Sequence, residues 1–191
     1  MVKLVSFYLI LNKLMTALIL IKKDSDIIMA VSSGQEVEKT FIVKEMPQLK
    51  KEEITDIAKV IQDYILKDGS GELRIRKVTN KREGTKYDMA VKVGNGMIRS
   101  EVYKLLTQEE WKQLKLVSKA TLIQTLIVHV SNEFVIHIYG GKLKGLVLVE
   151  VEFPSVKEAN RFIPPYWFGK EVTNDIRFRG KSLAFSEGIP Q

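Results

Sequence analysis

Two stretches of sequence decide the fold: residues 36–43, which read EVEKTFIV, and residues 145–153, which read GLVLVEVEF. In both stretches, glutamates alternate with other side chains at every second position. That period is typical of a β-strand with two chemically different faces. Glu36 and Glu38 therefore share one face of a first predicted strand, and Glu150 and Glu152 share one face of another.

The same period of two recurs along much of the chain. Further strands are predicted at residues 73–76, 89–93, 98–103, 126–130 and 134–139. The glycines of Gly94-Asn95-Gly96 predict a tight turn between two of these strands. Many strands with few helices predict an antiparallel, β-rich α+β domain and argue against a doubly wound parallel sheet.

Three helices are predicted to flank the sheet. Residues 52–67 carry isoleucine and alanine at helical spacing, which favours an amphipathic helix. Thr107 with Glu110, and Ser155 with Glu158, match the capping box that opens a helix. Charged residues alternate along several strands, and a sheet with this many strands has only these helices to cover it. Closing the sheet into a barrel would place the apolar faces outside and line the interior with charge.

Composition excludes several classes of protein. The 191 residues include no cysteine, which rules out disulfides, a thiolate nucleophile and a zinc ribbon. Thirty basic and 23 acidic side chains give a formal net charge of +7, which favours anionic partners. The chain has no P-loop, no GxSxG elbow and no Rossmann glycine pattern.

The first 28 residues form a doubtful hydrophobic extension, and the predicted domain occupies residues 29–191. Residues 4–21 are largely apolar but contain Lys13, which makes a membrane span marginal. Three interpretations stay open: a true start at Met29, an anchor or amphipathic helix, and a cleaved signal. We expect a cytoplasmic protein if Met29 is the start, and membrane association only if the extension is genuine.

The order of these motifs resembles the CYTH superfamily, the triphosphate tunnel metalloenzymes. Residues 36–43 are similar to its opening strand, which carries an ExExK motif. The resemblance covers about residues 35–185 and continues through Arg74-Ile75-Arg76, Lys92 before the glycine turn, Arg99-Ser100-Glu101, Tyr139-Gly140, residues 145–153, residues 167–173 and Ser182-Leu183-Ala184. It implies an antiparallel β-barrel, or tunnel, with a few flanking helices.

The resemblance also implies a site. Divalent cations, Mg²⁺ or Mn²⁺, would be held by carboxylates that suit hard ions, namely Glu36, Glu38, Glu101, Glu150 and Glu152. Phosphate oxygens would be bound by Arg74, Arg76, Lys92 and Arg99. Five carboxylates against four bases leave a balance of −1. Cations would therefore be needed to attract a polyphosphate. No catalytic residue is assigned.

Four positions depart from the family pattern. Thr40 stands where ExExK ends in lysine, and Tyr103 stands where glutamate is frequent. Lys119 is the only base in residues 119–127, which the family usually makes rich in lysine and arginine. His137 replaces an acidic residue, and we favour a structural, hydrogen-bonded role for it over that of a proton acceptor.

The leading hypothesis is metal-dependent hydrolysis of inorganic triphosphate or a small organic triphosphate. One alternative is a weakly active or non-catalytic module that binds polyphosphate or nucleotides, which Thr40, Tyr103 and the strand with Lys119 as its only base favour. Another is an adenylate cyclase, recognisable by its cyclic nucleotide and pyrophosphate products. No specific nucleic-acid partner is expected, because the bases alternate with carboxylates instead of forming a patch with stacking aromatic residues.

Overall fold

The computed structural model of the protein describes residues 31–66, 71–129 and 134–191. The interpretations of residues 1–28 lie outside these ranges. In the described ranges, no helix combines the length and the apolar character needed to cross a membrane.

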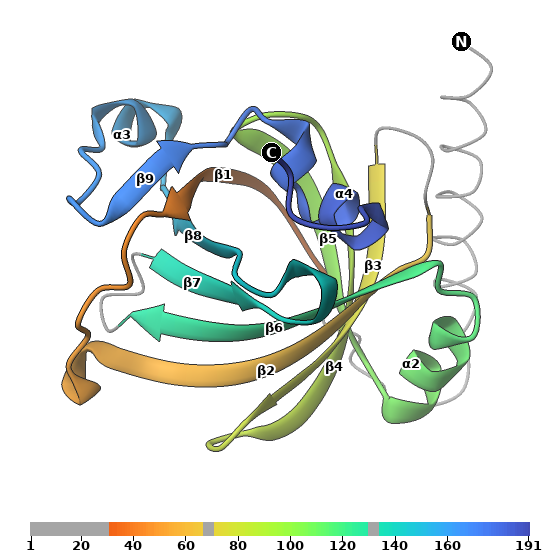
Figure 1. Ribbon diagram of the computed structural model, residues 1–191. Coiled ribbons are helices and arrows are strands. Elements are labelled where there is room, and N and C mark those ends of the chain that lie inside the picture. Colours follow the sequence, from red (N-terminus) through yellow and green to blue (C-terminus); the bar gives the residue numbers. More distant parts are fainter. Residues whose placement is uncertain (1–30, 67–70, 130–133) are drawn as a thin grey trace, which may run out of the picture. The chain divides into compact units, whose positions relative to one another are not determined.

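Nine strands within these described ranges form one antiparallel sheet. They are β1 (Val31–Val43), β2 (Ile54–Tyr64), β3 (Gly71–Asn80), β4 (Gly84–Val93), β5 (Ile98–Leu106), β6 (Ala120–His129), β7 (Phe134–Tyr139), β8 (Val147–Glu152) and β9 (Phe168–Glu171). Their order is β5-β4-β3-β2-β6-β7-β8-β1-β9, and an additional β1–β5 pairing joins the two sides. The first eight strands therefore close into an antiparallel barrel, which confirms the predicted fold (Figure 1).

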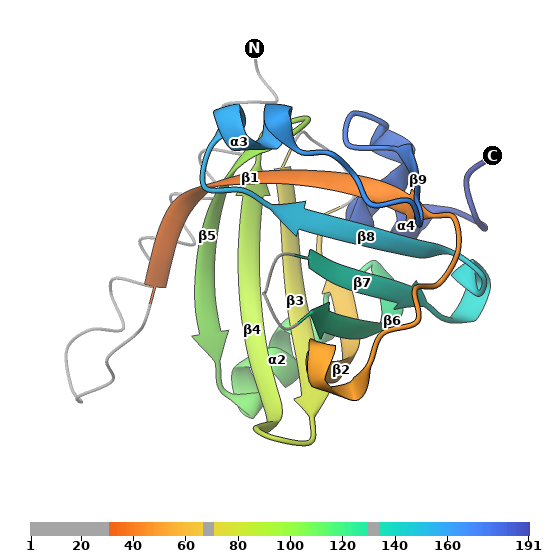
Figure 2. The ribbon, with the colours of Figure 1, turned by 90° about the vertical axis from the view of Figure 1, so that its left-hand side faces the viewer.

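Strand β1 closes the barrel because its two halves pair with different strands. Residues Val31–Val37 pair with β5, and residues Glu38–Ile42 pair with β8. Figure 2 shows β5, β4 and β3 side by side, β8, β7 and β6 in a second group, and β1 running alongside both. Strand β2 makes the other connection between the groups, since it pairs with β3 and β6.

Short helices cover parts of the barrel. They are α2 (Gln108–Lys115), α3 (Val156–Arg161) and α4 (Gly180–Phe185), with the 3₁₀ turns η1 (Lys51–Glu53), η2 (Gly141–Leu143) and η3 (Ile176–Phe178). Helix α2 packs against β3, β4 and β5, α3 against β1, and α4 against β6 and β2. The capping box at Thr107 is confirmed, because its hydroxyl accepts a hydrogen bond from the Glu110 amide and its own amide donates to the Glu110 carboxylate. At Ser155, the hydroxyl accepts from the Glu158 amide, but the Glu158 carboxylate accepts from the Ser155 hydroxyl and not from its amide.

The predicted helix over residues 52–67 is wrong, because most of this segment is strand β2. Inside the strand, burial alternates: Ala58, Val60 and Gln62 are buried, whereas Ile57 is half exposed. β-branched residues are dense here, and they fit a pleated surface better than a helix. The buried positions Ala58, Val60, Gln62 and Tyr64 follow the period of two of a strand and not the period of a helix.

Two apolar clusters hold the barrel. One fills the end that α4 covers and contains Tyr64, Leu122, Tyr139, Leu143, Leu146, Leu148, Val172, Phe178, Leu183 and Ala184. The other packs β9 and the residues preceding it against β1, β7 and β8, and it contains Phe41, Ile136, Val149, Val151, Trp167 and Phe168. Most of the side chains that line the cavity inside the barrel are polar or charged.

Candidate active site

The inner face of the barrel brings the predicted site residues together. Seven of the nine line one cavity of about 160 Å³: Glu36, Arg74, Arg76, Lys92, Arg99, Glu150 and Glu152. Glu38 lines an adjoining cavity of about 30 Å³ at one end, which we call the narrow end. Glu101 lines a wider space of about 350 Å³ at the other end, which we call the mouth. Neighbouring cavities share wall residues, so they form one passage.

The strand register places like charges side by side. Glu38 lies directly opposite Glu152 across the β1–β8 pair. Burial, reinforced by the Glu150 and Glu36 carboxylates, raises the pKa of Glu38 to about 7 despite the nearby Arg99. Like charges opposed in this way are unfavourable unless a counter-ion joins them.

The basic residues partly neutralise the negative charge of these carboxylates. Lys92 Nζ lies 2.8 and 2.9 Å from the two carboxylate oxygens of Glu36. Arg99 donates to Glu38 and, at 3.4 Å, to Glu36. Arg74 donates to Glu101 at 3.4 Å. The bases are therefore ion-paired across the passage, where a competing anion could reach them.

The side chains of the passage suit a metal ion by the chemistry of their donor atoms and not by their present arrangement. Within the described ranges, no three acidic or histidine side chains converge as ligands, because Lys92 and Arg99 lie among the carboxylates. The donors are nevertheless all carboxylate oxygens, which suit Mg²⁺ and Mn²⁺. Burial and the carboxylates Glu36, Glu150 and Glu101 also raise the pKa of Glu152. A divalent cation would relieve this repulsion.

The structure adds residues that the sequence interpretation missed. Glu72 and Arg179 line the passage, and Asp88 is buried with an oxygen 2.8 Å from Arg76 Nε. Glu72 could have been found, since it stands two positions before Arg74 on the same strand face. Arg179 carries no such signal, because it follows η3, outside every strand.

The four departures have structural outcomes. Thr40 lines the narrow end, and Lys39 lies outside the barrel, where its ammonium is 3.4 Å from Glu171. Tyr103 lines the mouth. Lys119 is absent from the passage wall, which at β6 shows Gln124 and Leu126 instead.

His137 lies inside the passage with its Nε2 3.0 Å from Glu150 Oε2. Burial works against the Glu150 carboxylate, but His137, Lys92 and Arg99 outweigh it and lower the pKa of Glu150. The histidine thus holds a carboxylate of the predicted metal set, in keeping with the structural role favoured from sequence.

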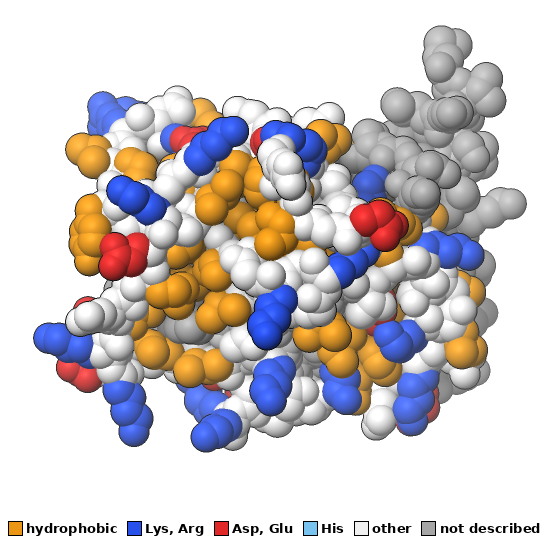
Figure 3. Space-filling view, viewed as in Figure 1, with side chains coloured by type: hydrophobic (Ala, Val, Ile, Leu, Met, Phe, Trp, Pro, Cys, Tyr) orange, Lys and Arg blue, Asp and Glu red, His pale blue; other side chains and the backbone are white. Residues whose placement is uncertain are grey.

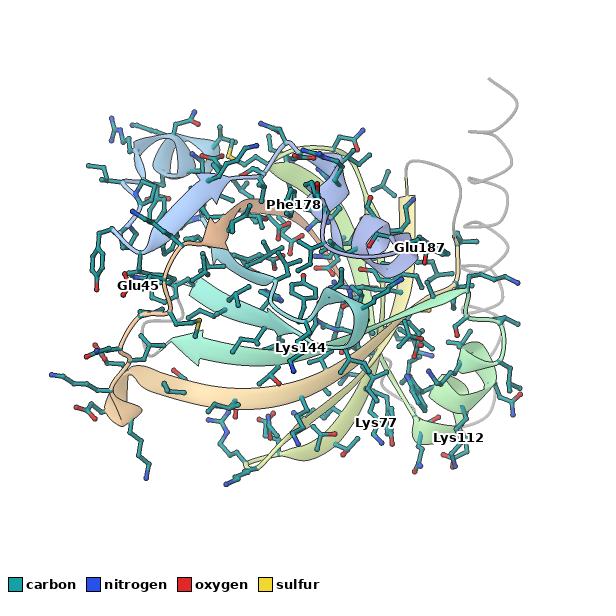
Figure 4. All side chains as sticks on the ribbon, viewed as in Figure 1. Glu45, Lys77, Lys112, Lys144, Phe178 and Glu187 are labelled. Atoms are coloured by element: carbon teal, nitrogen blue, oxygen red, sulfur yellow. The ribbon has the colours of Figure 1, made fainter. Side chains whose placement is uncertain are left out.

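The passage wall is acidic by one charge. Six glutamates face five basic side chains: Glu36, Glu38, Glu72, Glu101, Glu150 and Glu152 against Arg74, Arg76, Lys92, Arg99 and Arg179. Figure 4 shows side chains of facing strands meeting inside the barrel, whereas Lys112 and Lys144 lie outside it. On the face seen in Figure 3, Lys and Arg are scattered among apolar side chains.

Comparison with known proteins agrees with this geometry. The chain is 32% identical over 158 residues to an inorganic triphosphatase of Nitrosomonas europaea, covering 79% of this chain and 97% of the relative. A crystal structure of an inorganic triphosphatase superposes with a TM-score of 0.56 at 31% identity, covering 82% of this chain and 97% of that one.

A protein of Pyrococcus horikoshii OT3 superposes with a TM-score of 0.50 over 66% of this chain and 84% of its own. At 16% identity, that likeness concerns the fold alone. No protein-family model matches the chain.

Proposed function

The chain belongs to the family of the Nitrosomonas europaea inorganic triphosphatase, with its CYTH-like triphosphate tunnel fold, and on this premise we propose that it hydrolyses inorganic triphosphate or a small organic triphosphate with a divalent cation. One observation carries the proposal. Carboxylates and bases from β1, β3, β4, β5 and β8 line a single cavity inside the barrel. A tunnel wall of both signs fits a metal-bound polyphosphate.

The metal would be Mg²⁺ or Mn²⁺, held by Glu36, Glu38, Glu150 and Glu152, with Glu101 beside them at the mouth. When bound, such a cation neutralises phosphate charge and polarises the phosphoryl group. The wall has one more carboxylate than bases, so an unaccompanied triphosphate would be repelled. Cations are thus needed for binding as well as for chemistry.

The chain's own bases would bind and orient the substrate. Arg74, Arg76, Lys92 and Arg99 hold carboxylates at present, and a triphosphate oxygen can replace a carboxylate oxygen as their acceptor. The carboxylates released would then face the cation. His137 would keep Glu150 in place during this exchange. The nucleophile would be water, and the closed wall limits how much water reaches the phosphates.

A second candidate function has an observation of its own. The wall made by β2, β6 and β7 shows Gln62, Tyr64, Gln124, Leu126, Val135, His137 and Tyr139, none of them a lysine or arginine. A substrate would therefore be held strongly from one side alone. Such a passage could bind polyphosphate or a nucleotide with little turnover.

The deciding experiment measures phosphate release by the full chain. Tripolyphosphate, ATP and thiamine triphosphate are offered with and without Mg²⁺ or Mn²⁺. The test variant is Glu150→Gln. The matched control is Glu109→Gln, which changes an exposed glutamate on α2. We expect metal-dependent release that Glu150→Gln removes and Glu109→Gln keeps.

Each other result selects an alternative. Metal-dependent binding of tripolyphosphate without release would establish the binding module. Cyclic nucleotide and pyrophosphate formed from ATP would establish a cyclase. Absence of both binding and release would refute a triphosphate function for this barrel.

A further inference from the structure

The narrow end of the passage lacks the lysine that closes the ExExK motif, yet it contains a base from another element. Thr40 lines this cavity together with Arg99 and Arg179. Arg179 is 139 positions further along the chain and reaches the barrel from the segment between η3 and α4. The neutral residue on β1 and the base from the C-terminal segment thus share one small space.

The C-terminal segment is fixed against Thr40 by its backbone. The amide of Val172 donates to the Thr40 carbonyl at 2.8 Å, and the Thr40 amide donates to the Thr173 hydroxyl at 3.1 Å. Five residues after Thr173, buried Phe178 packs into the apolar cluster with Tyr64 and Leu183. Figure 4 labels Phe178 in the segment that leads to α4. Arg179 follows directly, so its place at the narrow end is set on both sides.

Close packing on the barrel reinforces this placement. A Cβ at Gly180 would lie 2.2 Å from the Tyr64 hydroxyl, so the chain can approach β2 only because this residue is glycine. A Cβ at Gly96 would lie 2.7 Å from Asn174, and Gly96 has a φ of +71°. Its carbonyl accepts a hydrogen bond of 3.2 Å from Arg179 Nη2. The β4–β5 turn therefore steadies one edge of the guanidinium.

Arg179 differs from the other bases of the passage in its ion pairing. Across the described ranges, it forms no ion pair within 4.0 Å, in contrast to Arg74, Arg76, Lys92 and Arg99. Burial and the like charge of Arg99 lower the pKa of Arg179, even though Glu72 and Glu38 oppose this shift. Two cations that face one small cavity repel each other unless an anion lies between them.

We propose that Arg179 replaces the missing lysine and, with Arg99, binds a terminal phosphate of the substrate at the narrow end. This assignment rests on the proposed triphosphate function. It makes the C-terminal segment part of the binding site. It also gives the substrate a direction, with one terminal phosphate at the narrow end and the other end of the substrate toward the mouth.

The test compares tripolyphosphate binding, measured by calorimetry with Mn²⁺, among full-length variants. We expect Arg179→Gln to weaken binding roughly ten- to a hundred-fold, as for a lost hydrogen bond between charged groups. Arg177→Gln is the matched control. It removes an exposed arginine two residues away that pairs with Asp175, and it should bind as the wild type does.

Rescue separates a phosphate contact from a structural role. Thr40→Lys in the Arg179→Gln background should recover most of the lost affinity, because it returns a base to the same cavity. Arg179→Lys should retain part of the affinity. Melting temperatures identify any variant that fails to fold, and Arg179→Lys then replaces Arg179→Gln in the comparison.

The outcomes are distinct. If the wild type does not bind tripolyphosphate, the proposed function is wrong and this inference is wrong with it. If the wild type binds and folded Arg179→Gln or Arg179→Lys binds equally well, only the assignment of Arg179 is overturned. Loss of binding that Thr40→Lys cannot restore in a folded protein would also contradict replacement of the lysine.

Discussion

The two halves of the barrel wall differ in almost every property except their strand geometry. The half made by β1, β8, β5, β4 and β3 carries the glutamates and bases of the passage, whereas β2, β6 and β7 present amides, aromatic rings, a histidine and aliphatic side chains. Side chains from the second half, such as Tyr64 and Leu122, also belong to the apolar cluster beneath α4. On the inner face, one half collects the charged side chains, and the other adds neutral side chains to the apolar cluster beneath α4.

This division has a physical reason. Buried charges cost free energy, and a small barrel has few apolar contacts to offset that cost. Concentrating the charges on adjacent strands lets each base meet a carboxylate, as Lys92 meets Glu36 and Arg99 meets Glu38. The neutral strands are then free to pack. Stability and binding should therefore respond to different mutations.

The largest effect is expected from Leu122→Ala, which removes a fully buried side chain of β6 from the apolar cluster. The lost burial and the cavity left behind should lower the free energy of unfolding by about 2–5 kcal/mol. Urea denaturation measures this change. Folded Leu122→Ala should still bind Mn²⁺ like the wild type, and a parallel loss of metal affinity would contradict the separation of the two halves.

The next effect concerns the charged half. Glu36→Gln should weaken Mn²⁺ binding by at least about ten-fold, since it removes an ionised ligand from the predicted metal set. Lys92→Ala should weaken tripolyphosphate binding by a similar factor and change Mn²⁺ affinity less. Calorimetry with Mn²⁺ and then with tripolyphosphate measures the affinity of each variant for each ligand.

The pattern across the two variants is the informative part. The free energies of unfolding of the two variants should differ by less than about 1 kcal/mol, because each substitution leaves one partner of an ion pair without its counter-charge. If neither substitution alters either ligand, the residues have been assigned to the wrong task and the tunnel interpretation fails.

The smallest effect is a dependence of stability on pH. Glu38 has a pKa of about 7 in the folded protein, against 4.5 as the ordinary value, so the folded state holds its proton longer than the unfolded state. Between these values, rising pH should therefore destabilise the metal-free protein. Glu150 has a lowered pKa, and its contribution is lost only at more acidic pH.

Melting temperatures from pH 4.5 to 8 test this prediction. The decline should be a few degrees in the wild type and clearly smaller in Glu38→Gln. Equal slopes for the two proteins would show that Glu38 is not the group that titrates.

The sequence predicted the barrel and the charged half well because both depend on local alternation. Glutamates and bases at every second position of a strand lie on the same face, whichever distant strands pair with it. The helix over residues 52–67 failed because spacing was counted without the β-branched residues that favoured a strand. Arg179 could not be found by such reasoning, because its place depends on the contacts of Val172, Thr173 and Phe178 with distant strands. The roles of the site residues remain predictions.

Strand β1 changes partners between Val37 and Glu38, so the two glutamates of its opening motif stand on either side of the barrel's seam. Glu36 faces Arg99 on β5, and Glu38 faces Glu152 on β8, which lies 114 positions away. Pairings this distant carry a large loop-closure entropy and tend to form late. The binding site therefore does not exist until the last seam is joined. A ligand that contacts residues on both sides of the seam binds only the closed barrel. It therefore shifts the folding equilibrium toward the closed barrel and raises the stability of the folded protein.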